Sequence, residues 1–181
     1  MIHHRFGART ACPSPASAPE PDEAGIGYNP ALIPAEEDHV SELTLQQANA
    51  IIEAVLEGAR AQDMPPLAVA VLDSGAHLKA LQREDGVSFL RVQIAEAKAW
   101  GALAMATDSD KLAERYAQDD QQKGFINALN AMTGGRIVPL PGGVLLRDAT
   151  GQVIGAVGAA GGVSEDDEAC VRAAIRQNGL E

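Results

Sequence analysis

The 181 residues include 25 acidic and 14 basic side chains, for a formal net charge of −11, and 46% of them are hydrophobic. This composition suits one globular domain with a core of its own and a short extension. The acidic balance argues against a nucleic-acid partner or an anionic membrane surface. No run reaches the roughly 18 apolar residues of a membrane-spanning helix, and the first residues lack the apolar centre of a signal peptide. We therefore expect a cytoplasmic protein.

Residues 1–40 differ in composition from the rest of the chain. Six prolines are scattered there among alanine, serine and acidic residues. Such a segment can bury little surface, so we expect an irregular extension at 1–40 and one domain at 41–181. The two cysteines, Cys12 and Cys170, have neither a metal-binding spacing nor the pattern of a disulfide framework. We therefore expect no metal site, and we expect Cys170 to be buried in the last helix.

The domain opens with a helix. Thr44 and Gln47 have the spacing of a capping box, and apolar residues then recur at helical spacing. The helix should reach about Gln62, because Pro65-Pro66 follows.

A β-hairpin is expected next. Residues 67–72 form a continuous apolar run, which is typical of a strand buried on both faces. Residues 73–76 have the composition of a turn, and 77–83 return as the partner strand. Two strands joined by so short a turn pair in antiparallel fashion.

The middle of the chain is expected to be mostly helical. An alanine-rich helix is predicted over 88–106, followed by short helices around 111–117 and 125–132. Ile137-Val138 is a candidate short strand.

The last part of the chain predicts a second hairpin and a helix. Residues 144–146 and 152–158 are apolar strands on either side of a turn at 147–151. Gly161-Gly162 ends the second strand, and Ser164 can cap the last helix. The four acids that follow Ser164 suit the positive end of a helix dipole.

These elements predict an α/β (α+β) fold. Five short strands, mostly linked as hairpins, favour an antiparallel sheet with helices on its faces. The chain has no βαβ alternation and no GxGxxG after a strand, which excludes a Rossmann fold.

Three stretches resemble one known family. VAVLDSGAHLKALQREDG (69–86), EAKAWGALAM (96–105) and LPGGVLLRDATGQVIGAVGAAGGVSEDDEACVRAAI (140–175) are similar to segments of the GlcG/HbpS haem-binding-protein family (DUF336). This family also occurs as the C-terminal domain of PduO-type proteins. The resemblance covers about 43–178. The chain departs from the family's common residues at three positions, where Ala76, Leu145 and Ala160 replace Gly, Pro and Ser.

The resemblance carries expectations for fold, assembly and ligand. It implies profilin-like α-β-α layers around a five-stranded antiparallel sheet. It also implies homo-oligomers, often built from dimers. The residues by themselves do not identify a cofactor. The resemblance implies haem.

Several polar residues could carry chemistry. Arg83, Glu84 and Asp85 stand at a strand end, where loops often carry function. Arg83 could clamp a carboxylate, Glu84 or Asp85 could take a proton, and Lys98 could hold an anion or act as an acid. The structural alternative is that Arg83 pairs with Asp85 and that Lys98 pairs with a neighbouring acid.

Ligand contacts are expected at two further kinds of residue. The Gly142-Gly143 and Gly161-Gly162 bends could offer backbone N–H groups, although the acids beside the second bend would repel an anion. His77, the only histidine in 41–181, could be an axial haem ligand or could form a turn hydrogen bond. Tyr116, Met105 and Met132 are weaker candidates for the same role.

Two classes of function follow. The first is an oligomeric protein of the GlcG/HbpS type that binds a small ligand, with haem as a candidate. The second is an enzyme, an isomerase or hydrolase, that acts on a small organic acid through Arg83, Glu84 or Asp85, and Lys98. A subunit-interface pocket containing both Arg83 and Lys98 would favour the enzyme.

Overall fold

The computed structural model describes residues 42–181, so the predicted extension at 1–40 lies outside the described part. Apart from the strand expected at Ile137-Val138, the elements follow the expected order: α1 (Leu45–Ala61), β1 (Ala68–Asp73), β2 (Leu78–Arg83), α2 (Leu90–Met105), α3 (Ser109–Gln118), α4 (Asp120–Met132), β3 (Gly143–Arg147), β4 (Val153–Ala160) and α5 (Ser164–Gln177). The predicted capping box is present, with both Thr44–Gln47 hydrogen bonds formed. Within residues 42–181, no helix is long and apolar enough to cross a membrane.

The strands form one antiparallel sheet with the order β2-β1-β4-β3. Its four described strands correct the expectation of five. Ile137-Val138 is not a strand. Instead, the Ile137 N–H donates to Oδ1 of Asn130 at 3.0 Å, and the Ile137 side chain is only 2% exposed. Pro139 and Pro141 lack the N–H groups that a ladder needs, so this segment runs as a loop into β3.

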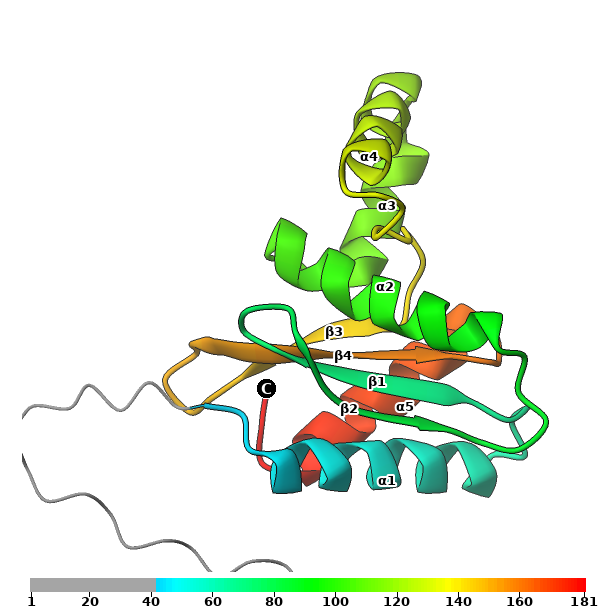
Figure 1. The fold of residues 1–181 in the computed structure, drawn as a ribbon, viewed down its shortest axis with the longest axis vertical. Helices are drawn as coiled ribbons and strands as arrows, with labels where there is room; N and C mark the ends of the chain where they lie inside the picture. Colours follow the sequence, from blue (N-terminus) through cyan, green and yellow to red (C-terminus); the bar gives the residue numbers. More distant parts are fainter. Residues whose placement is uncertain (1–41) are drawn as a thin grey trace, which may run out of the picture. The chain divides into compact units, whose positions relative to one another are not determined.

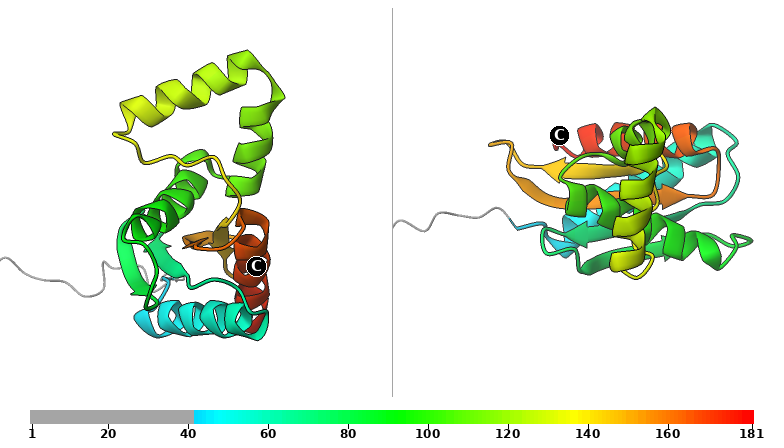
Figure 2. Two further views of the ribbon diagram at one scale, coloured as in Figure 1. Left: turned by 90° about the vertical axis from the view of Figure 1, so that its right-hand side faces the viewer. Right: turned by 90° about the horizontal axis from the view of Figure 1, so that it is seen from above.

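The sheet is the middle one of three layers (Figure 1). Helices α1 and α5 cover one face and α2 covers the other, as the turned views in Figure 2 also show. β1 alternates accordingly, with Val69 and Val71 packed towards α1 and α5, and Ala68 and Ala70 packed towards α2.

Small residues bring α2 very close to the sheet. A Cβ placed on Gly158 of β4 would collide with the carbonyl oxygen of Ala95 in α2, and one on Gly143 of β3 would collide with that of Lys98. The small-residue run of the predicted strand 152–158 therefore has a packing role.

Helices α3 and α4 form an arm that extends from α2 away from the sheet (Figure 2). Their own small core contains Leu112, Ile126 and Ile137, each at most 2% exposed. The loop after α4 returns along this arm to β3 (Figure 1). Its residues Gly134, Gly135 and Arg136 line a cavity together with residues of α2.

Candidate functional site

A cavity of about 520 Å³ lies between α2, the β1–β2 hairpin and the loop after α4. Helix α2 contributes Gln93, Glu96, Ala97 and Trp100, which are three and four residues apart and so share one helix face. The hairpin contributes His77 and its neighbours, and the loop contributes 134–136. Cavities of this size commonly hold small molecules.

His77 stands at the hairpin end of this cavity, with its side chain 83% exposed. Its Nδ1 lies 3.5 Å from Oδ1 of Asp73, and the same oxygen accepts the backbone N–H groups of His77 at 3.0 Å and Gly75 at 2.9 Å. The His77 N–H is the largest cause that lowers the pKa of Asp73. The turn therefore holds an ionised carboxylate against Nδ1, which leaves Nε2 as the nitrogen that can face a ligand.

Trp100 and Arg136 form a second part of the cavity wall. The guanidinium carbon of Arg136 lies 5.6 Å from the centre of the Trp100 ring, within cation–π range. Neither Trp100 nor Arg136 was among the candidate site residues that the sequence indicated. The spacing of 93, 96, 97 and 100 on one helix face was a signal for Trp100, but only the fold brings the loop after α4 to that face.

Arg83, Glu84 and Asp85 line a different, shallower groove together with Arg60. Glu84 has a structural role, because its carboxylate pairs with Arg60 at 2.8 Å and accepts the N–H of Leu67 at 2.8 Å. The structural alternative from the sequence was an ion pair between Arg83 and Asp85. Among residues 42–181, the ion pair found in this loop joins Arg60 and Glu84 instead. Arg83 and Asp85 are exposed.

Lys98 is enclosed by protein. The residue is 1% exposed, and its Nζ donates to the carbonyl of Ala159 at 2.9 Å and lies 3.4 Å from Oδ2 of Asp167. Burial lowers the pKa of Lys98, and the charge of Asp167 opposes that shift. This contact corresponds to the structural alternative for Lys98, a pairing with a neighbouring acid. Among residues 42–181, Lys98 lines none of the five main cavities, and Arg83 lines one of them.

In the two glycine bends, three of the four N–H groups are bonded to side chains of this chain. Those of Gly142, Gly143 and Gly162 donate to side chains of Glu168, Ser109 and Asp167 at 3.0, 2.7 and 3.0 Å. A ligand at Gly142-Gly143 or at Gly162 would have to replace these side chains. A Cβ on Gly161 would collide with the carbonyl oxygen of Pro66, so that bend is also closely packed.

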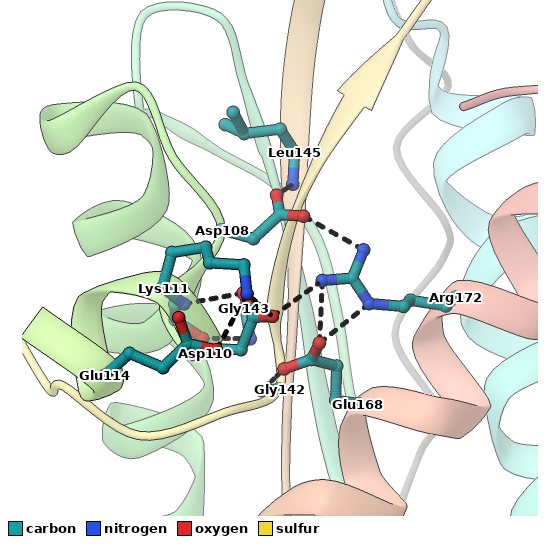
Figure 3. A network of polar contacts seen from close by, with 10 residues as sticks. Asp108, Asp110, Lys111, Glu114, Gly142, Gly143, Leu145, Glu168 and Arg172 are labelled. Carbon is teal, nitrogen blue, oxygen red and sulfur yellow. Dashed lines mark hydrogen bonds and ion pairs between the residues drawn. The ribbon is translucent and has the colours of Figure 1, made fainter.

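Arg172 of α5 organises the polar network around these bends (Figure 3). It contacts Glu168 at 2.7 Å, Asp108 at 2.9 Å and Asp110 at 3.5 Å. The other Asp108 oxygen accepts the N–H of Leu145 at 2.9 Å. The outward-facing N–H groups of Gly143 and Leu145 in the edge strand β3 thus donate to side chains of this chain. These hydrogen bonds protect that edge from pairing with another chain. The sequence signal for this network was only the spacing of four residues between Glu168 and Arg172.

The chain belongs to the HbpS-like family: the family model described as "Haem degrading protein HbpS-like" matches residues 43–176. This confirms the resemblance seen in the sequence motifs. A comparison with curated proteins found no match.

Solved structures share the fold over most of the domain. Klebsiella pneumoniae protein ORFY, a DUF336 protein, matches at 25% identity with a TM-score of 0.70, covering 80% of this chain and 95% of that chain. HbpS matches at 26% identity with a TM-score of 0.64, covering 79% and 94%. A PduOC–heme complex matches at 24% identity with a TM-score of 0.69, covering 77% and 97%, which shows a shared fold.

Proposed function

We propose that this protein binds a flat small-molecule ligand, and haem foremost, in the cavity between α2 and the β1–β2 hairpin. The observation that carries the proposal is that one cavity of about 520 Å³ is lined by His77, Trp100 and Arg136. Family membership supports haem, and so does the heme complex of a protein with the same fold.

These residues fit haem in chemical terms. Imidazole is a usual axial ligand of haem iron, and a carboxylate on the other ring nitrogen orients such a ligand and raises its basicity. Asp73 stands in that relation to His77, with its oxygen 3.5 Å from Nδ1. Trp100 offers an aromatic wall. Haem would supply the iron and the porphyrin ring, while the chain would supply the imidazole, the wall and a cation.

The test is a haem titration followed at the Soret band and by the fluorescence of Trp100, the only tryptophan in the chain. His77→Ala should remove the spectral signature of imidazole ligation. Asp73→Asn should weaken haem binding by about 10-fold or more, the lower end for loss of a partner of a metal ligand. Lys79→Ala is the matched control, because Lys79 is close in sequence and is not among the residues lining this cavity. A wild-type Soret band in His77→Ala would contradict the axial role.

We also propose that copies of this chain associate. Three large apolar side chains, Phe89, Met132 and Val163, are 76%, 75% and 62% exposed. The resemblance to the GlcG/HbpS family, which implies homo-oligomers, supports the same proposal. Sedimentation at micromolar concentration should give a species larger than the 18.8 kDa chain. A monomer under those conditions would contradict this part of the proposal.

A further inference from the structure

Charge is distributed unevenly around the cavity. Among the described residues that line it, Arg136 is the one permanent cation and Glu96 is the one carboxylate. The remaining lining is apolar, amide or backbone, apart from His77. A ligand that carries negative groups would therefore be held at Arg136 and repelled at Glu96.

The backbone holds Arg136 firmly while its side chain stays exposed. Gly134 and Gly135 adopt φ values of 69° and 84°, a turn that other residues rarely make. The Gly135 N–H donates to the carbonyl of Asn130 at 2.8 Å, and the Asn130 side chain accepts the N–H of Ile137 at 3.0 Å. Because Ile137 is buried in the α3–α4 core, the position of the Arg136 backbone is set on both sides.

The guanidinium group of Arg136 is available to bind a carboxylate. None of the ion pairs among residues 42–181 involves Arg136. Its contact with Trp100 is a cation–π contact to an aromatic ring, so it engages none of the N–H donors in an ion pair. Those donors form the fork that binds a carboxylate through two parallel hydrogen bonds.

We propose that Arg136 is the specificity-determining residue of this cavity, and that it selects flat aromatic ligands with carboxylates on one edge. The inference rests on the proposed function and adds the ligand class. Iron protoporphyrin, with two propionates on one edge of the ring, belongs to that class. The cavity wall formed by α2 and the hairpin would contact the ring, and the Arg136 fork would bind a propionate.

The experiment compares acid and ester forms of one ring. The full chain is titrated with haem, with metal-free protoporphyrin and with the dimethyl ester of that porphyrin, following Trp100 fluorescence. The wild type should bind the acid form about 10- to 100-fold more tightly than the ester, the effect of one charge-assisted hydrogen-bonded pair. Arg136→Gln should reduce the affinity for the acid to that for the ester, and Arg136→Lys should restore little of it.

Two further variants serve as controls. Arg176→Gln removes an equal charge from an exposed position on α5, outside the lining of this cavity, and should leave all affinities unchanged. Glu96→Gln should strengthen binding of the acid form and leave the ester alone. The comparison of acid with ester on the wild type needs no variant, so it decides the question even if Arg136→Gln folds poorly.

The outcomes distinguish carboxylate binding by Arg136, called the clamp below, from the proposed binding of haem through His77. If haem binds through His77 but acid and ester bind equally, the clamp is wrong and the haem proposal stands. If the acid is preferred through Arg136 while His77→Ala keeps the wild-type Soret band, the clamp stands and the axial role is wrong. If no porphyrin quenches Trp100, both proposals are wrong.

Discussion

The buried pair of Lys98 and Asp167 allows the sharpest test of the structure. Their side chains are each 1% exposed, so neither charge reaches water. Breaking a buried ion pair by removing one partner costs about 3 to 5 kcal/mol, since the other charge is left uncompensated. The Nζ–Oδ2 distance of 3.4 Å is longer than a strong charged hydrogen bond, which places Asp167→Asn near the lower end of that range.

Asp167→Asn and Lys98→Met should differ in how much they lower the free energy of unfolding. In Asp167→Asn, Lys98 keeps the carbonyl of Ala159 as a partner and can lose its proton. Lys98→Met leaves the Asp167 charge buried and removes the donor to Ala159, so it should cost more. In the double variant neither charge remains, and its cost should be smaller than the sum of the single costs by about 2 kcal/mol or more.

The stability of Asp167→Asn should depend on pH. Burial already lowers the pKa of Lys98 below its ordinary 10.5, and loss of Asp167 removes the charge that opposes this shift. Between the folded pKa and the unfolded pKa, the unfolded state binds more protons. The free energy of unfolding therefore rises with pH in that window. The stability deficit of Asp167→Asn relative to the wild type should shrink as pH rises towards 10.

The assay is urea unfolding followed by far-ultraviolet circular dichroism at pH 7 and pH 9.5. Asp166→Asn is the control, because Asp166 is exposed and its substitution should change stability by less than about 0.5 kcal/mol. An Asp167→Asn variant as stable as this control would refute the reasoning. So would a deficit that stays the same at both pH values.

Three further predictions concern packing, the second groove and the domain boundary. Gly158→Ala should lower the melting temperature strongly, because its Cβ would collide with the α2 backbone, whereas Gly124→Ala meets nothing within 4 Å and should be neutral or stabilising. Arg83→Ala should lower the free energy of unfolding by at most about 1 kcal/mol and leave haem affinity unchanged. A loss of affinity in the haem titration would show that Arg83 contributes to ligand binding. A chain that starts at Ser41 should still unfold cooperatively by circular dichroism, and a gradual transition would show that 1–40 contribute to the core.

Local sequence patterns predicted most of the fold. The capping box at Thr44, the apolar run before Asp73 and the turn at 147–151 each act over a few residues, so they can be read without knowing the neighbours in space. The prediction failed at Ile137-Val138, where two apolar residues looked like a strand. Burial of Ile137 against α3 and α4, which no local pattern reports, replaced the expected ladder.

The candidate site needed the tertiary structure. His77 stood out in the sequence because its chemistry is rare in this chain, and Lys98 stood out because it lies in a matched motif. Only the fold shows that Lys98 is enclosed by Asp167 and that His77 shares a cavity with Arg136. Arg136 lies 59 positions after His77, and the α3–α4 arm sets how the chain returns to α2. The spacing of residues in a sequence shows which of them share a face of one helix or strand. A site also depends on which helices, strands and loops pack together, and local spacing does not show that.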